Sequence, residues 1–412
     1  MTEKRVVITG TGAVSPVGND AASSWEAVCA GKNGIGKITK FDISDQKVSM
    51  GAEVKDFEYP DKREGKRLDL FSQYGIVATG EALAQAGLVI GENIAAQRIN
   101  TYVGSGIGGI MTLEAEIKKA SQEGKGPKYV SAMLVPMIIG NMAAGNIAIA
   151  YGLKGSALDL VTACSCGTHA IGEAFRTIRH GYADAVVAGA TEAPFAAVCF
   201  AGFANMKAMN TTDDPARASI PFDAERGGFV MGEGAGILVL EELEHAKARG
   251  ANILAEVVGY GTTCDAYHIT SPAPTGEGAA ASMKMAIESA GISPSQISYI
   301  NAHGTSTPLN DLYETRAIKE VFGAAAYDIP VSSTKSMTGH MLGAAGGIEA
   351  VFCVGAIRDG IVPPTIGYKV ADEELDLDYV TEGARKVSVE YTLSNNLGFG
   401  GHNGTVVFKR YE

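Results

Sequence analysis

The sequence predicts an α/β protein built from two similar halves, and three observations lead to this prediction. Short apolar, strand-like runs alternate with helix-like runs along all 412 residues, a pattern typical of α/β folds with parallel strands. The runs also repeat, because residues 1–250 and 251–412 each present five strand candidates in the same rhythm. No Pro/Gly/Ser-rich linker separates the halves, so we expect them to pack together.

In the N-terminal half the strand candidates are the apolar runs RVVITGTGAV, INTYVGSG, SALDLV, DAVVAGA and GAGILVLE. Segments 17–98 and 106–156 are longer than simple crossovers need. We interpret them as helical insertions that line a pocket or pair subunits. The third strand of this half leads into a helix at residues 161–175, VTACSCGTHAIGEAF.

In the C-terminal half the strand candidates are ILAEVVGYGTT, ISYINAHG, DIPVSST, VEYTLSN and GTVVFKR. The junction equivalent to residues 161–175 reads VSSTKSMTGHMLGAAGGIEAVF and carries His340 near its helix start. The small residues GAAGG predict close approach of another backbone there. A pseudo-two-fold relation between the halves would direct the two helix N-termini, one with Cys164 and one with His340, at a common centre.

Composition and charge exclude several classes of function. A net charge of −12 leaves no general basic field for nonspecific binding of nucleic acid. The opening MTEKRVVITG enters a strand pattern directly, without the charged and apolar segments of an export signal. No apolar run approaches the roughly 20 residues that a membrane-spanning helix needs. We therefore expect a cytoplasmic protein with no membrane partner.

The sequence also gives no reason to expect a disulfide, a metal or a nucleotide. The six cysteines are scattered, so reduced thiols are expected in that compartment. Cys164 and Cys166 have no second close pair and no His-x3-His partner to complete a zinc site. VVITGTGAVSPVG begins like a dinucleotide-binding fingerprint, but Ser15 stands at the third glycine position and Pro16 follows it.

The junction at residues 161–175 places two cysteines at a strand-to-helix turn. Unpaired backbone N–H groups and the helix dipole favour negative charge there, which predicts a lowered thiol pKa, as a nucleophile requires. Residues two apart lie about 200° apart around a helix, so Cys164 and Cys166 do not face the same site. We assign Cys164 as the nucleophile and expect Cys166 to point into packing. A buried, inert cysteine is the alternative interpretation of Cys164.

Three other segments carry candidate site residues. His303, in YINAHGTSTPLND, follows a strand at the sheet edge where α/β folds place their sites. The nearby hydroxyls of Thr305 and Thr307 either bind an amide-rich ligand or shape a turn. VSSTKSMTGHMLGAAGG adds Lys335 and His340. The glycines of LSNNLGFGGHNGTVVF allow either a turn that presents an amide N–H to an oxyanion or a simple tight hairpin.

Together these motifs resemble those of the β-ketoacyl-acyl carrier protein synthases, and most closely the elongating type II members. TAC-x-x-G, NAHGTSTP, STKSMTGH and GFGGHN are long, jointly specific and spread over the whole chain. The resemblance implies a thiolase-like fold with a duplicated five-layered α/β/α/β/α architecture, and a homodimer. It implies substrates carried on the phosphopantetheine arm of acyl carrier protein, with neither metal nor organic cofactor.

The resemblance also implies a reaction, the decarboxylative condensation of malonyl-acyl carrier protein with an acyl chain held on the nucleophile. The family's Cys-His-His triad matches Cys164, His303 and His340. Supporting roles, in orienting the histidines or completing the oxyanion hole, match Lys335, Glu314 and Phe399. The wall that binds the pantetheine arm matches Thr305, Thr307, Thr270 and Ser271. The gate between the nucleophile and the acyl tunnel matches Phe399 and Ile107.

Docking of an acidic carrier protein on an acidic enzyme requires local basic patches. One cluster lies in DKREGKRLD, and three lysines lie elsewhere. The residues expected to dock the carrier are Lys62, Arg63, Lys66, Arg67, Lys125, Lys128 and Lys207. A solvated face is the alternative interpretation of such a charge run.

Two other functions share these motifs: a polyketide-type ketosynthase, and a noncatalytic partner subunit of a condensing complex. The chain departs from the family pattern at Cys166, where serine or another small residue is usual, and this leaves the role of that thiol open. In SAMLVPMIIGNM, Met133 and Leu134 stand where relatives often carry phenylalanine in the tunnel wall. The motifs therefore do not set the range of acyl chains.

Overall fold

The computed structural model describes residues 3–412, and its largest feature is a sheet of ten strands in the order β10-β9-β13-β14-β8-β1-β7-β6-β4-β5. The N-terminal half contributes β1 (Val6–Val14), β4 (Ile99–Gly104), β5 (Ala157–Leu158), β6 (Ala185–Glu192) and β7 (Gly234–Glu242). The C-terminal half contributes β8 (Ala255–Cys264), β9 (Tyr299–Asn301), β10 (Val331–Ser332), β13 (Tyr391–Gly398) and β14 (His402–Lys409). All ten predicted strands are present.

The two halves repeat the same topology. Read from its outer edge inward, each half has its third, second, fourth, fifth and first strand in that order. The halves join where Val6–Ile8 of β1 pairs with Ala255–Val257 of β8. The predicted duplication is therefore an exact repeat of strand order.

The prediction of parallel strands is only partly correct. β4 pairs in parallel with β5 and β6, and β9 pairs in parallel with β10 and β13. β7, by contrast, runs antiparallel to both β1 and β6, and β14 runs antiparallel to β13 and β8. Apolar runs show that a strand is buried on both faces but carry no information about its direction.

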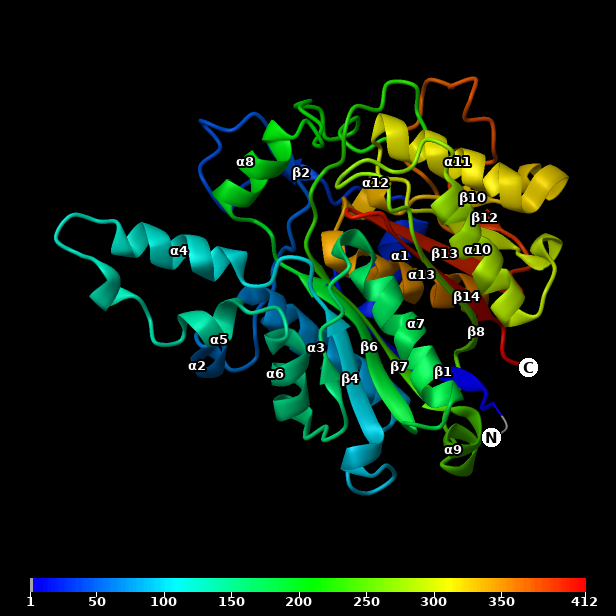
Figure 1. The fold of residues 1–412 in the computed structure, drawn as a ribbon, viewed down its shortest axis with the longest axis horizontal. Coiled ribbons are helices and arrows are strands. Elements are labelled where there is room, and N and C mark those ends of the chain that lie inside the picture. Colours follow the sequence, from blue (N-terminus) through cyan, green and yellow to red (C-terminus); the bar gives the residue numbers. More distant parts are fainter. Residues whose placement is uncertain (1–2) are drawn as a thin grey trace.

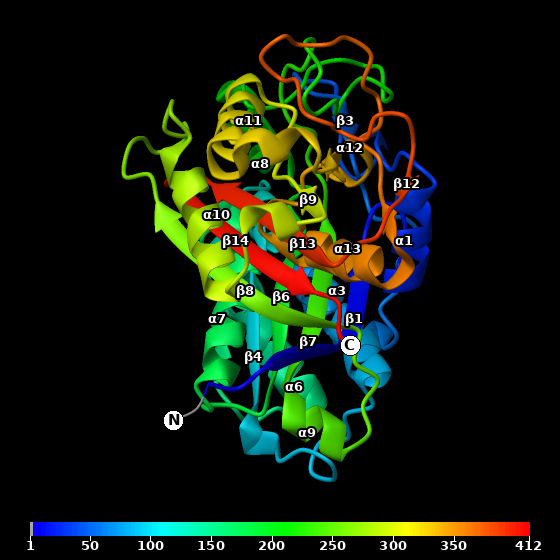
Figure 2. The same ribbon diagram turned by 90° about the vertical axis from the view of Figure 1, so that its right-hand side faces the viewer.

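The two halves of the sheet alternate with three layers of helices, which makes five layers in all (Figures 1 and 2). In the central layer, α7 (Cys166–Arg179) and α13 (Ala345–Asp359) pack on each other and on strands of both halves. α3 (Leu70–Ala86) and α6 (Met142–Tyr151) cover the outer face of the N-terminal half, and α10 (Glu277–Ala290) and α11 (Pro308–Phe322) cover that of the C-terminal half. This arrangement confirms the predicted α/β/α/β/α architecture.

Successive side chains of a strand point alternately toward the two helical layers beside it. In β6, Val186 and Ala188 belong to the apolar cluster around the central helices, whereas Ala185 and Val187 belong to the cluster under α3. A strand with helices on both faces buries every side chain, which explains the uninterrupted apolar runs in the sequence.

Glycines let the two central helices touch. A Cβ atom at Gly167 of α7 would lie 2.4 Å from the backbone nitrogen of Gly347 in α13. One at Gly236 of β7 would lie 2.1 Å from the nitrogen of Ile348. Contacts this short exclude any side chain, so the close approach predicted from GAAGG is confirmed.

Each of the two segments predicted as helical insertions contains one helix of the layered core and other helices at the periphery. Segment 17–98 contains α3, which is part of the layered core, and the peripheral α1 (Ala21–Cys29) and α2 (Lys62–Gly65). Segment 106–156 contains α6 of the core, and before it an arm of α4 (Ile110–Ala120) and α5 (Leu134–Ile138) that projects from the body (Figure 1).

The remaining elements are short. They are α8 (Ala197–Asn205), α9 (Leu243–Ala248), α12 (Lys335–Thr338) and the two-stranded pairs β2 (Gly36–Lys37) with β3 (Met50–Gly51) and β11 (Ile361–Val362) with β12 (Arg385–Lys386). Among residues 3–412, no helix has both the length and the apolar character that crossing a membrane requires.

Candidate active site

Cys164 lies in a one-turn helix, Ala163–Ser165, that immediately precedes α7. Ala163 has a φ of 53°, in the left-handed region that side chains disfavour. The equivalent turn of the second half, Leu342–Ala344 before α13, has the same feature, with a φ of 47° at Leu342. The repeat therefore extends to backbone torsions, and it makes Gly343 the counterpart of Cys164 in the second half.

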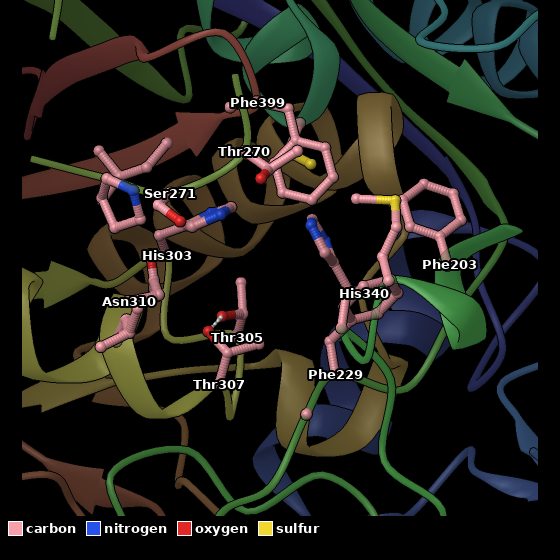
Figure 3. Close-up of a pocket in the computed structure, with 18 of the residues that line it drawn as sticks. Phe203, Phe229, Thr270, Ser271, His303, Thr305, Thr307, Asn310, His340 and Phe399 are labelled. Atoms are coloured by element: carbon pink, nitrogen blue, oxygen red, sulfur yellow. Dashed lines mark hydrogen bonds between the residues drawn. The ribbon is translucent and has the colours of Figure 1, made fainter. Parts of the chain in front are cut away.

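A cavity of about 290 Å³ opens beside Cys164 and is lined by both candidate histidines (Figure 3). The rings of His303 and His340 meet edge to face, with centroids 5.2 Å apart. His303 follows β9, and His340 lies between α12 and the turn at Leu342. The structure thus brings Cys164, His303 and His340, predicted from three distant segments, to one cavity.

Two backbone N–H groups, that of Cys164 itself and that of Phe399, act on the Cys164 thiol and lower its pKa, against the larger effect of burial. Phe399 follows β13 in the tight turn to β14. Gly398 allows this approach, because a Cβ there would lie 2.5 Å from the carbonyl oxygen of Thr162. These two donors are placed to hold a negatively charged oxygen that forms on a carbonyl attached to the sulfur.

The resting thiol is protonated at neutral pH, contrary to the lowered pKa that the helix N-terminus predicts. Burial raises the pKa of Cys164 to about 12, and the carboxylate of Glu192 acts in the same direction. The charge of Lys335 and the two N–H groups lower this pKa, but by less. Desolvation outweighs the effect of the helix terminus on this pKa.

His303 is held through its backbone and its ring. Glu314 accepts hydrogen bonds from the backbone N–H groups of His303 (2.7 Å) and Gly304 (2.8 Å). The amide nitrogen of Asn396 lies 3.3 Å from the His303 Nδ1. Burial, together with the positive charge of Lys335, lowers the pKa of His303 and of His340 well below the ordinary value, so both rings are neutral.

Lys335 forms a buried ion pair with Glu349, with 2.5 Å between Nζ and Oε1 and both side chains 1% exposed. Glu314 is not the ion-pair partner of Lys335, because it accepts from the His303 and Gly304 backbone N–H groups, but against the effect of burial, which raises the pKa of Glu314, the positive charge of Lys335 still lowers it. Glu349 was not singled out, since it stands in the apolar and glycine-rich start of α13.

Glu192 is a second carboxylate that the sequence interpretation missed. It ends β6, is fully buried, and accepts hydrogen bonds from the Ser105 hydroxyl and the N–H groups of Gly106, Ile107 and Gly343. It therefore joins the GSGIGG loop of one half to the His340-bearing segment of the other. Burial raises its pKa to about 7.

The second cysteine of the pair, Cys166, contacts only the protein interior. Cys166 is fully buried, and its Sγ donates to the carbonyl oxygen of Ala163. The thiol therefore points into packing, as expected. Cys166 does not line the cavity beside Cys164.

The four hydroxyl residues predicted to bind the pantetheine arm all line the cavity (Figure 3). Thr305 and Thr307 hydrogen-bond each other, with 2.9 Å between their hydroxyl oxygens, and Thr270 and Ser271 lie in a separate loop. Ile107 does not line the cavity but packs into the apolar cluster that includes Cys164 and Leu342. The roles of these residues stay predictions.

The basic residues predicted to dock the carrier are all exposed, but they lie in three places. Lys207, just after α8, lines the cavity mouth. Lys125 and Lys128 lie in the arm between α4 and α5. Lys62, Arg63, Lys66 and Arg67 lie in or next to α2, which is well separated from α8 (Figure 1). In one chain these residues do not form a continuous patch.

No set of three or more His, Cys, Asp or Glu side chains between residues 3 and 412 is arranged to hold a metal ion.

Comparison with known families gives two adjoining matches. Residues 3–246 match the family described as Beta-ketoacyl synthase, N-terminal domain, and residues 254–369 match Beta-ketoacyl synthase, C-terminal domain.

Two full-length relatives carry the same printed name. The 3-oxoacyl-[acyl-carrier-protein] synthase 2 of Staphylococcus aureus (strain COL) is 53% identical over 412 residues, which cover 99% of each chain. That of Synechocystis sp. is 51% identical over 416 residues, which cover 100% of this chain and 99% of the relative.

Solved structures share the whole fold. A beta-ketoacyl synthase from Burkholderia phymatum matches with a TM-score of 0.92 and 34% identity, over 99% of this chain and 100% of the other. A type II PKS acyl-carrier protein in complex with its ketosynthase also matches, with a TM-score of 0.92, 34% identity and 100% of each chain covered.

These comparisons confirm the predicted family, its thiolase-like fold and the prediction of a condensing acyltransferase. The chain belongs to the β-ketoacyl synthase family.

Proposed function

We propose that the protein is a 3-oxoacyl-[acyl-carrier-protein] synthase that lengthens acyl chains by two carbons through decarboxylative condensation with malonyl-acyl carrier protein. One observation carries the proposal: Cys164, two neutral imidazoles and two converging N–H groups surround one cavity. Identity of 51–53% with full-length relatives of that name supports the substrate class.

In the first half-reaction the Cys164 sulfur attacks the thioester carbonyl of an acyl group on the carrier. Because burial keeps the thiol protonated, its proton must leave as the carbon–sulfur bond forms, and the neutral ring of His340, which lines the same cavity, accepts it. The backbone N–H groups of Cys164 and Phe399 hold the oxyanion. The pantetheine thiolate departs and takes up the proton, so the acyl group ends on Cys164.

In the second half-reaction malonyl-acyl carrier protein enters the same cavity. The N–H groups of His303 and His340 donate hydrogen bonds to the malonyl thioester oxygen. As carbon dioxide leaves, negative charge develops on that oxygen and an enolate forms. The enolate carbon attacks the acyl-Cys164 carbonyl, the carbon–sulfur bond breaks, and the Cys164 thiolate takes up one proton from solvent, which balances the loss of the malonyl carboxylate as carbon dioxide. The product is a 3-oxoacyl group on the carrier.

This reaction needs neither a metal nor an organic cofactor, because loss of carbon dioxide drives formation of the new bond. We propose acyl carrier protein as the partner, with docking on Lys207, on the arm lysines and on the basic residues near α2. The exposure of these side chains supports that role.

We further propose a homodimer in the cytoplasm, on the basis of the family resemblance. β5 is an edge strand whose two residues, Ala157 and Leu158, are exposed, and two apolar side chains of the neighbouring segments are exposed too, Val161 (58%) and Ile149 (78%). An unpaired edge with an apolar surround favours pairing with a second copy.

The test is intact-mass measurement after incubation with an acyl-carrier protein, followed by product analysis with malonyl-carrier. The wild type should gain one acyl group and release a 3-oxoacyl product two carbons longer. Cys164→Ala should gain no acyl group, and Cys166→Ala should acylate normally. An adduct that persists in Cys164→Ala but is absent in Cys166→Ala would refute the assignment.

A polyketide-type ketosynthase is the second candidate, because a structure of that kind shares the whole fold at 34% identity. Product analysis separates the two candidates. A single extension of a saturated acyl primer supports fatty acid elongation, whereas repeated extension without reduction supports polyketide synthesis.

A further inference from the structure

We propose that Asn396 is a positioning residue that fixes the proton of His303 on Nε2, the ring nitrogen left to face the substrate. The inference deepens the proposed function, in which His303 uses that N–H to donate a hydrogen bond to the malonyl thioester oxygen. Asn396 lies in β13, is fully buried, does not line the cavity, and contacts His303, which does.

The orientation of the Asn396 amide follows from its neighbours. Its nitrogen lies 2.8 Å from Oε2 of Glu349, whose other oxygen is paired with Lys335. An ionised carboxylate accepts hydrogen bonds and donates none, so the amide NH₂ must face Glu349. On the opposite side the Thr168 hydroxyl donates to the amide oxygen. The Glu349 contact selects this orientation, and the Thr168 contact is satisfied by it.

This orientation determines which nitrogen of His303 carries the proton. An NH₂ group has two hydrogens, so the second is directed at the His303 Nδ1, 3.3 Å away. Nδ1 must then present its lone pair. Because the lowered pKa keeps the ring neutral, its single proton resides on Nε2. Before any substrate binds, the chain from Lys335 through Glu349 and Asn396 has set His303 as a donor.

His340 has no equivalent arrangement. Its Nδ1 is buried and has no hydrogen-bond partner among residues 3–412. The two histidines therefore enter the reaction differently: His303 has a fixed tautomer, whereas nothing in the described chain fixes the tautomer of His340. Of the two, His303 is the donor that is set in advance for decarboxylation.

The test is ¹⁵N NMR of the histidine rings in full-length protein labelled at the ring nitrogens, with the His303 signals assigned from their loss in His303→Gln. In the wild type the proton should be on Nε2. Asn396→Asp puts an oxygen opposite Nδ1, so the proton should move to Nδ1. Malonyl decarboxylation should fall about 100-fold, the cost of one lost donor to an oxyanion, while Cys164 acylation stays within about threefold.

The matched control is Asn395→Asp, since Asn395 is equally buried but contacts Met283 and Thr405 on the opposite face of β13. It should leave the His303 tautomer unchanged. If Asn396→Asp does not fold, Asn396→Ser replaces it, and mixed tautomers are expected because a hydroxyl both donates and accepts.

A wild-type His303 protonated on Nδ1, or no change of tautomer in any folded Asn396 variant, would overturn the proposal. The NMR result does not depend on any substrate. A wild type with the Nε2 proton that makes no 3-oxoacyl product would therefore refute the proposed function and leave this assignment in place.

Discussion

Replacing Gly398 with alanine tests the two-donor oxyanion hole by sterics alone. Gly398 does not have a positive φ, so alanine causes no torsional strain there. Its Cβ would lie 2.5 Å from the Thr162 carbonyl oxygen, 3.0 Å from the Ser165 hydroxyl and 3.3 Å from the Cys164 nitrogen. A carbon atom needs roughly 3.0 Å or more, so the turn must retreat by about 0.5 Å or more and carry the Phe399 N–H away from the sulfur.

The expected cost is that of one oxyanion-hole donor, about 10²- to 10³-fold in the rate of Cys164 acylation. The assay is rapid quenching followed by intact-mass measurement of the acyl adduct. Alkylation of Cys164 by iodoacetamide forms no oxyanion and should stay within about twofold. Gly202→Ala, in α8 with no atom within 4 Å of the new methyl group, is the control and should acylate normally. Gly398→Ala that acylates within threefold of the wild type would refute the two-donor geometry.

Three further predictions concern the surroundings of the site. Lys335→Met leaves the Glu349 carboxylate buried without its partner and should lower the free energy of unfolding by about 3–5 kcal/mol in denaturant titrations; a loss below 1 kcal/mol would contradict this. Burial lowers the pKa of His169 to about 4, so the neutral ring stabilises the fold fully above pH 6.5, and this contribution is lost as the pH falls toward 4. The difference in free energy of unfolding between wild type and His169→Asn should therefore shrink by about 3 kcal/mol across that range. A difference that stays constant with pH would contradict this. Reversing the charges of Lys66 and Arg67 should slow acyl transfer from carrier protein at low salt but not from a small acyl thioester, and equal rates with the carrier would remove these residues from the docking surface.

The sequence was sufficient to predict elements that depend on local pattern. Apolar runs located all ten strands, and the two junctions at Cys164 and His340 revealed the duplication. Strand direction was not predictable, because a strand buried on both faces reads the same either way. The third strand of each half, β5 and β10, has only two residues, although the apolar runs there are longer.

The groups behind the catalytic side chains were the least predictable part of the site. Glu349 stands among small and apolar residues, and Asn396 is one of two adjacent asparagines. Only the packing of α13 against β13 brings them together behind Lys335 and His303. Glu192 likewise gains its four donors from two separate loops. The sequence does carry one signal, since a carboxylate inside an otherwise apolar element must find partners when it is buried.

The contact of Gly167 with Gly347 has a consequence for how substrates enter. Backbones in van der Waals contact across the central layer, continued by the pairing of β1 with β8, leave no plane along which the halves can hinge. Admission of the pantetheine arm and exit of the product therefore rely on short loops such as the Phe399 turn. Movements of that size take nanoseconds to microseconds, so we expect loop motion to be faster than the bond-making steps.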